Sequence, residues 1–175
     1  MVVPVLATER LLLRPRDHRD IDAFVSMDSD IDVRRYLPPA FRDHFEAEAY
    51  RALLPQRMAM DFGPGLGHWS MVLAQDPDFF IGTALLIPVA GEGPDIEIGW
   101  RLRRTCWGQG YATEAAKKIL AHAAGVVPPG DLVALIHPDN AASIGVAAKI
   151  GFARAGVREA YGTTFDLYRP GRQAS

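Results

Sequence analysis

The chain has 175 residues, of which 49% are apolar and 23% charged, and its formal net charge is −2. These values suit one globular domain and exclude the strongly basic balance typical of nucleic-acid-binding domains. Cys106 is the only cysteine, which excludes an internal disulfide framework and favours a reducing compartment. Because the sequence shows neither a secretory signal nor an apolar window of membrane length, we expect a cytoplasmic protein with no nucleic-acid or membrane partner.

The first half of the chain predicts helices and strands in alternation. We expect a strand at 10–14, a helix capped by Asp17 or Asp20 that runs to about Met27, and a helix at 44–59 that Pro55 kinks or splits. Two strands at 69–74 and 79–87 are typical of a hairpin.

The second half opens with a strand whose side chains alternate in character. Over 95–102, Ile96, Ile98, Trp100 and Leu102 share one face, and Glu97 lies on the other. The elements expected after it are a helix at 112–124, a buried strand at 132–136, a helix from the cap Asn140 to about Ile150, and a last strand at 165–169. This order predicts a mixed α/β domain with a largely antiparallel front half and a β-α-β unit behind it.

Two glycines, Gly108 and Gly110, stand directly before the helix at 112–124. The first N–H groups of a helix have no partner within it, and glycine lets the backbone approach a bulky anion. No Asp or Glu occurs from 101 to 113, and Arg101 precedes the turn together with Arg103 and Arg104. The P-loop and Rossmann patterns both fit poorly, so the residues alone leave open an anion site or a plain tight turn.

Three segments resemble one family. "WGQGYATEAAKKIL", "HPDNAASIGVAAKIGF" and "TERLLLRPRDHRDIDAF" are similar to the GCN5-related N-acetyltransferases (GNAT), and more narrowly to their RimJ/RimL-type branch. The resemblance extends from Thr8 to about Arg169, so we expect residues 1–175 to form one acetyltransferase domain. It implies a mostly antiparallel central sheet flanked by helices, with strands that splay apart at the cofactor site. Trp107 stands where the family pattern usually has Gln or Arg.

The resemblance implies acetyl-CoA as the cofactor. Its pyrophosphate would lie on the turn, and its pantetheine arm would pair with the end of the preceding strand as an extra strand would. Asn140 would contact the pantetheine or cysteamine region, a role compatible with capping its helix, and Ser143 would lie near the thioester sulfur. The cofactor residues implied in this way are Leu102, Arg103, Arg104, Trp107, Gly108, Gln109, Gly110, Tyr111, Ala112, Thr113, Asn140 and Ser143.

Direct acyl transfer from a thioester to an amine needs a base, an oxyanion donor and an acid for the leaving thiolate. For the base we favour Glu97, with Glu159 as second candidate; each is alternatively a surface carboxylate. For the acid we favour Ser143, alternatively bonded only to its own helix start, with Tyr161 as runner-up. We expect the oxyanion donor to be a backbone N–H of the strand from Glu97 to Leu102.

Other reactive residues carry weaker indications. Cys106 invites a covalent mechanism but is better interpreted as a packed thiol. The five histidines show no ligand spacing, so we expect no metal, and we expect His122 to face solvent.

The leading functional hypothesis is an acetyl-CoA-dependent N-acetyltransferase that moves an acetyl group directly to a primary amine. The rival hypotheses are a non-catalytic acyl-CoA-binding regulatory module and an enzyme that uses another acyl group such as succinyl. The amine acceptor is a peptide N-terminus or a small molecule. The acidic run 28–32 either attracts a cationic amine or forms a solvated loop. The sequence leaves open whether the chain forms a homodimer.

Overall fold

The computed structural model describes residues 3–91, 93–128 and 130–171, and these residues form one eight-stranded sheet in the order β1-β2-β3-β4-β5-β6-β8-β7. Every neighbouring pair is antiparallel except β5 and β6, which are parallel. The strands are β1 (Leu6–Ala7), β2 (Leu11–Pro15), β3 (Gly67–Leu73), β4 (Phe80–Pro88), β5 (Ile96–Leu102), β6 (Leu132–Ile136), β7 (Phe152–Ala160) and β8 (Thr163–Pro170). The expected mixed α/β sheet with a β-α-β unit is confirmed.

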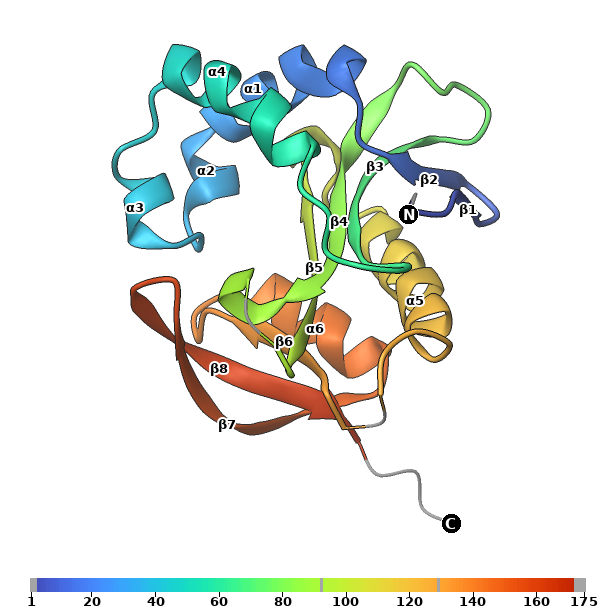
Figure 1. Ribbon diagram of the computed structural model, residues 1–175, viewed down its shortest axis with the longest axis vertical. Coiled ribbons are helices and arrows are strands. Elements are labelled where there is room, and N and C mark those ends of the chain that lie inside the picture. The colour runs from blue at the N-terminus through green and yellow to red at the C-terminus, as the bar shows by residue number, and fades with distance from the viewer. Residues whose placement is uncertain (1–2, 92, 129, 172–175) are drawn as a thin grey trace.

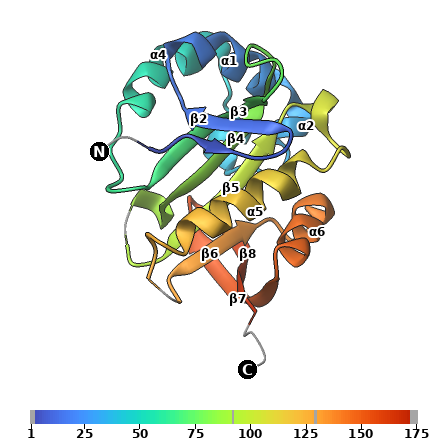
Figure 2. The same ribbon diagram turned by 90° about the vertical axis from the view of Figure 1, so that its right-hand side faces the viewer.

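The helices lie on both faces of this sheet (Figures 1 and 2). One group gathers over the first face, called here the front face: α1 (Ile21–Ser29), α2 (Ile31–Arg34), α3 (Pro39–Arg42) and α4 (Ala47–Met58). On the opposite face α5 (Tyr111–Ala123) packs against β4 and β5, and α6 (Ala141–Lys149) lies beside it. Within the described residues, no helix is long and apolar enough to cross a membrane.

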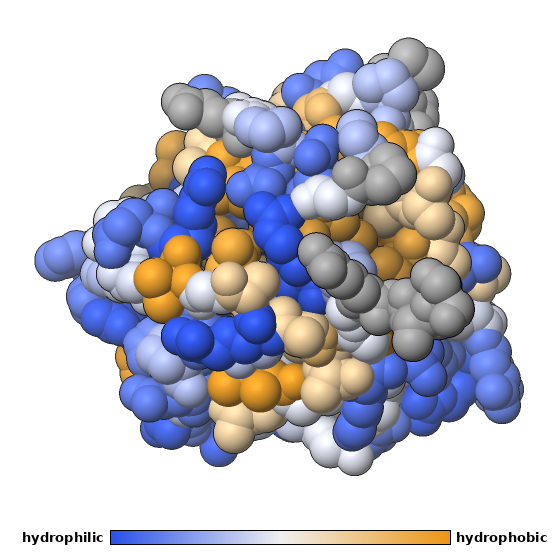
Figure 3. All heavy atoms as spheres, turned by 90° about the horizontal axis from the view of Figure 1, so that it is seen from below, coloured by the Kyte–Doolittle hydropathy of each residue, from blue (hydrophilic) through white to orange (hydrophobic). Residues whose placement is uncertain are grey.

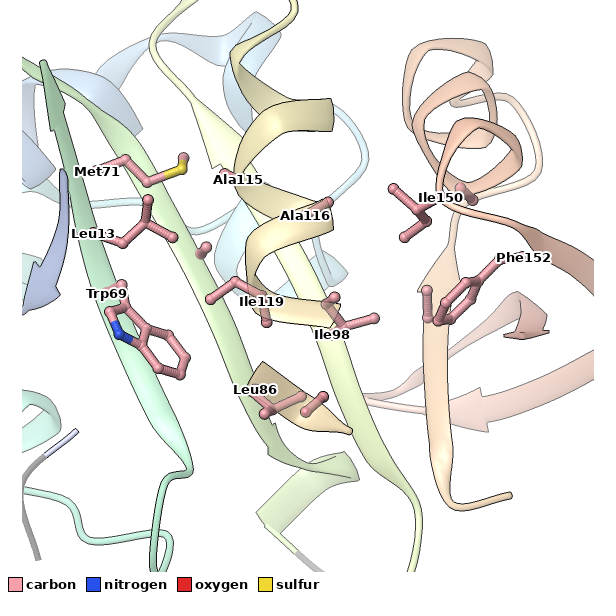
Figure 4. Close-up of a cluster of buried hydrophobic side chains, with 14 of the residues drawn as sticks. Leu13, Trp69, Met71, Leu86, Ile98, Ala115, Ala116, Ile119, Ile150 and Phe152 are labelled. Carbon is pink, nitrogen blue, oxygen red and sulfur yellow. The ribbon is translucent and has the colours of Figure 1, made fainter. Parts of the chain in front are cut away.

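Two apolar clusters hold these layers together. The larger one fills the space between the sheet and α5 (Figure 4). There Trp69, Ile98 and Ile119 pack together, and the side chain of each is at most 1% exposed. The smaller one joins α1 and α4 to the front face through Phe24 and Phe80, whose rings meet edge to face at 5.0 Å. The surface seen from below in Figure 3 mixes hydrophilic and hydrophobic side chains, with no apolar area extending across it.

Two expectations from the sequence were wrong, and three short elements were not predicted. Pro55 does not split helix α4, which continues for another turn, because a proline near the end of a helix removes only one of its last hydrogen bonds. His122 does not face solvent; its Nε2 lies 2.7 Å from the carbonyl oxygen of Gly65 and its ring meets Trp69 edge to face. The short elements β1, α2 and α3 carry too little periodicity to be predicted.

The parallel pair β5–β6 is short, and this shortness shapes the site. The two strands pair only at Ile96 with Leu132 and at Glu97 with Val133, after which β6 continues beside β8. Because the backbone groups of a strand alternate in direction, those of Trp100 and Leu102 point toward β6 but have no strand opposite them. The sheet therefore opens into a slot that begins at Glu97.

Candidate active site

The turn before α5 presents a row of free backbone donors. Gly110 caps the helix at φ +82° and Gly108 has φ +74°, a left-handed region in which glycine carries no strain. The first helical bond runs from the Glu114 N–H to the Gly110 carbonyl. Within the described residues, the N–H groups from Gly108 to Thr113 have no intramolecular acceptor. Six consecutive N–H groups at a helix start are a binding site for an anion.

An ionic network holds this turn in place from the outside. Glu114, which the helical pattern alone leaves facing solvent, accepts from the Thr8 hydroxyl at 2.6 Å and from Arg10 Nε at 2.7 Å. Arg10 also donates to the Gln109 carbonyl at 3.0 Å and lies over the Tyr111 ring. A carbonyl bound by an arginine turns away from the N–H side of the loop, so the loop keeps its donors directed outward.

The slot between β5 and β6 meets this turn. Trp107 Nε1 donates to the Leu102 carbonyl at 2.9 Å, and the Arg103 N–H donates to the Ile81 carbonyl at 2.9 Å. The Leu102 carbonyl and the Arg103 N–H are therefore already hydrogen-bonded within the protein. Trp100 keeps its N–H and carbonyl free of backbone partners on the β6 side, and Leu102 keeps its N–H. An extended amide-containing chain is the ligand that such an unpaired strand edge takes.

Helix α6 contributes one occupied and one free polar side chain. Asn140 caps the helix, its Oδ1 accepting from the Ser143 N–H at 3.1 Å, as the sequence predicts. The Ser143 hydroxyl itself makes no hydrogen bond to any residue in the described ranges. It is partly exposed in the first turn of α6 and available to a ligand.

Glu97 is the chemically most unusual group of the sheet. It belongs to the last pair of the β5–β6 ladder, and its Oε2 accepts from the Tyr161 hydroxyl at 2.7 Å. Burial raises the pKa of Glu97 to about 7, against the smaller opposite effect of the Tyr161 hydrogen bond. A carboxyl group with this pKa gains and loses its proton near neutral pH, which a general base needs.

Tyr161 reaches Glu97 from the tip of the β7–β8 hairpin. Its φ of +52° is unusual for a residue other than glycine, and its oxygen accepts from the Ala90 N–H at 3.0 Å. The hydroxyl is thereby held between a donor and the Glu97 carboxylate. Burial and the charge of Glu97 raise the pKa of Tyr161, so its hydroxyl stays protonated.

The remaining predicted site residues lie elsewhere. Glu159 is exposed on β7, where it accepts from the Thr164 hydroxyl, and no contact joins it to Glu97. Arg104 extends toward α2 and pairs with Asp30 at 2.9 Å and Asp32 at 3.7 Å. Cys106, interpreted from the sequence as a packed thiol, is 2% exposed and packs in the larger cluster.

Sequence reasoning missed a buried ionic cluster on the front face. Asp28, with no exposed surface, accepts from the Tyr50 hydroxyl at 2.8 Å and from Arg101 Nη2 at 3.0 Å. Arg101 Nε and Asp28 Oδ1 also approach to 2.9 Å, although the angle does not favour a hydrogen bond. The alternation of β5 puts Arg101 on the same face as Glu97, and this pattern could have indicated that Arg101 belongs to the site. No sequence pattern indicated that Asp28 of α1 would be its partner.

Comparisons with known proteins agree with this geometry. A model of the acetyltransferase (GNAT) domain matches residues 10–153. The N-acetyltransferase p20 of Bacillus licheniformis is 27% identical over 93% of this chain and 92% of its own. YkkB of Bacillus subtilis is 33% identical over 83% of each chain. The crystal structure of a GNAT-family acetyltransferase from Bacillus anthracis superposes with a TM-score of 0.75 at 26% identity, covering 94% of this chain and 95% of that one.

The turn and the slot fit what a thioester cofactor with a diphosphate and an amide-containing arm requires, namely free amides and an unpaired strand edge, and the Glu97–Tyr161 pair lies where the slot begins, at the end away from the turn. With the family match covering most of the sequence, acetyl-CoA is the cofactor, and the chain belongs to the GNAT family of N-acetyltransferases.

Proposed function

We propose that this enzyme transfers an acetyl group directly from acetyl-CoA to a primary amine, with Glu97 as the base. The observation that carries the proposal is the position of Glu97, with its raised pKa, at the point where β5 and β6 part. Bound acetyl-CoA supplies the thioester carbonyl that the amine attacks. A base at the opening of the slot stands between that carbonyl and the front face, from which the acceptor enters.

Each of the other polar groups has a proposed task. The N–H groups from Gly108 to Thr113 hold the diphosphate, and the edge of β5 at Trp100 and Leu102 aligns the pantetheine arm. Glu97 takes a proton from the ammonium form of the acceptor, directly or through one water. The free N–H of Trp100 is the proposed donor to the developing oxyanion.

Ser143 is the proposed proton donor to the leaving thiolate, supported by its unengaged hydroxyl. Tyr161 instead acts as a positioning residue, because its proton is committed to Glu97 at 2.7 Å. If so, Ser143→Ala lowers kcat about tenfold or more and leaves the Kd for coenzyme A unchanged. An unchanged kcat would remove Ser143 from the mechanism.

A thiol-release assay with acetyl-CoA and a panel of amines and short peptides tests the function. We expect release of coenzyme A that depends on the amine, with mass spectrometry locating one added acetyl group on nitrogen. Succinyl-CoA in place of acetyl-CoA tests the other acyl group left open by the sequence. Binding of coenzyme A without turnover of any amine would contradict the proposal.

A further inference from the structure

The front face of the sheet carries a row of partly exposed side chains that leads away from Glu97. His68, Leu85 and Gly99 are successive partners across β3, β4 and β5. Arg16 follows Pro15, the partner of Trp69, and therefore lies opposite His68. Arg16, His68, Leu85, Gly99 and Glu97 are all partly exposed, whereas their strand neighbours Trp69, Leu86 and Ile98 are buried. Solvent thus reaches a row of side chains that leads from Glu97 to Arg16.

A cationic cavity lies at the far end of this row, beside Arg16 and His68. A cavity of about 50 Å³ is lined by Arg16, Arg57 and His68, together with apolar residues such as Met58 and Phe62. It has room for a group of a few atoms, such as a carboxylate.

Neither arginine of the cavity has a carboxylate partner within the part of the chain that the structure describes. Arg16 Nη2 makes only a long hydrogen bond of 3.4 Å to the Arg57 carbonyl. The nearby acids are already engaged: Asp20 pairs with Arg14 at 2.7 Å, Asp28 pairs with Arg101, and Asp61 accepts from the Gly63 N–H at 2.9 Å. Arg16 and Arg57 therefore line the cavity without an ion pair to any described carboxylate.

The protonation of these groups reflects that surplus of positive charge. Burial is the largest cause that lowers the pKa of Arg16 to about 10; Tyr50, the next largest, raises the pKa, Arg101 and Arg57 lower it, and Asp20 raises it. Burial first, and then Arg16, Arg101 and Arg57, lower the pKa of His68 well below its ordinary value. His68 is neutral at pH 7, and a bound anion would relieve the repulsion among the arginines.

The acidic run of α1 and α2 does not offset this charge. Asp28 is buried against Arg101, Asp30 pairs with Arg104, and Asp32 contacts Arg104 and Arg35. These carboxylates are neutralised by arginines of the same chain, so they do not form an attraction for a polyamine. The sequence-based alternative of a cationic acceptor drawn by residues 28–32 loses its support.

We infer that Arg16 and Arg57 bind a carboxylate carried by the acceptor itself, which makes the acceptor class an amine with a distant anionic group. The inference rests on the proposed function, since it assumes that the amine is attacked beside Glu97. Two strand spacings and two residues separate Glu97 from His68, which places their α-carbons about 12 Å apart. An extended peptide rises about 3.4 Å per residue, so a tetrapeptide of about 14 Å covers this distance and brings its C-terminal carboxylate to the arginines.

The test compares two acceptors that differ only at the far end. Ala-Ala-Ala-Ala with a free carboxylate and Ala-Ala-Ala-Ala amide carry the same N-terminal residue, and both are assayed with acetyl-CoA. We expect the wild-type KM to be at least tenfold lower for the acid. Arg16→Gln should raise the KM for the acid to nearly that of the amide, and leave the KM for the amide and the Kd for coenzyme A unchanged. Because both enzymes meet the same two amines, the comparison cancels any difference in amine pKa.

Two variants control for charge and for folding. Arg51→Gln removes the same charge from an exposed position of α4 that lies outside the cavity, and should keep the preference for the acid. Arg16→Lys keeps a cation and should retain part of the preference, which separates anion binding from packing. Inorganic phosphate should compete with the acid and leave the amide unaffected; an equal effect on both would assign the cavity to a free anion and overturn the inference.

The outcomes separate the two proposals. Equal KM values for acid and amide in the wild type, with both acetylated, overturn the carboxylate site and keep the acetyltransferase mechanism. If neither peptide is acetylated, the proposed mechanism is wrong. The carboxylate site is then tested by calorimetry, which measures the Kd of each peptide for the protein loaded with coenzyme A. There, tighter binding of the acid that Arg16→Gln abolishes supports the site, and equal binding refutes it.

Discussion

Replacing Glu97 with glutamine removes the proposed base and changes little else. The side chain keeps its length, and the amide oxygen still accepts from the Tyr161 hydroxyl that donates to Glu97 at 2.7 Å. The glutamine cannot take a proton from an ammonium group. Loss of a general base lowers kcat by about 100- to 10,000-fold, whereas the Kd for coenzyme A should stay within about twofold because the binding turn is untouched.

The pH dependence makes this prediction sharper. With a pKa of about 7, Glu97 is about one-tenth ionised at pH 6 and about nine-tenths ionised at pH 8. The amine substrate also loses its proton over this range, but equally for both proteins. The ratio of wild-type to Glu97→Gln kcat/KM, measured by thiol release, should therefore rise about ninefold from pH 6 to pH 8.

The same substitution should stabilise the fold at alkaline pH. In the unfolded chain Glu97 ionises near 4.5, so between that pH and about 7 only the folded protein holds the proton. Wild-type stability falls as pH rises through this window, and the rise in pKa corresponds to at most about 3 kcal/mol. Glu97→Gln does not titrate and does not lose this stability. Urea unfolding should therefore show that its free energy of unfolding increases relative to that of the wild type between pH 4.5 and pH 8. A variant with wild-type activity and no such gain would refute the assignment of Glu97.

Three further substitutions test other parts of the site. Tyr161→Phe removes a hydrogen bond that lowers the pKa of Glu97, so the rising limb of kcat/KM should move to higher pH and kcat should fall; an unmoved limb would argue against the contact. Gly108→Ala adds a methyl group to the proposed phosphate cradle at φ +74°, and Gly91→Ala adds one to a loop at φ +82°, both into open space. Both should cost about 1 kcal/mol of unfolding free energy, but only Gly108→Ala should weaken coenzyme A binding by calorimetry, and equal affinities would refute the cradle. Asp28→Asn leaves the Arg101 guanidinium without its counter-ion and should lower the free energy of unfolding by about 3 kcal/mol. The control Asp22→Asn alters an exposed ion pair on the same helix and should change the free energy of unfolding by less than about 1 kcal/mol. Similar losses for the two variants would mean that the cluster is not ionic.

The sequence predicted the parts of the site that depend on local rules. The helix at 112–124 and the turn before it follow from periodicity and from Gly108 and Gly110, and the structure has them one residue earlier, at Tyr111–Ala123. The alternation over 95–102 correctly separated Glu97 from the apolar face of β5. Asn140 was predicted as a cap from residue type and position alone.

Other parts failed because no local rule reaches them. Pro55 was expected to disturb a helix, yet its place near the C-terminal end makes the lost bond cheap. Glu159 and Glu97 were both candidates for the base, and for each the sequence left open the alternative of a surface carboxylate. Only the packing of the hairpin distinguishes them, since it leaves Glu159 in solvent and Tyr161 on Glu97.

By itself the sequence determined which backbone segments are regular, which face of each is apolar, and where a helix start presents free amides. These depend on side-chain period and on backbone conformation within a few residues. The tertiary structure decided the rest: the early parting of β5 and β6, the Tyr161–Glu97 contact across 64 positions, and the position of Arg16, which makes no ion pair with the residues that the structure describes. Each depends on which distant segments meet when the core closes, and burial there sets the pKa values that local composition leaves undetermined.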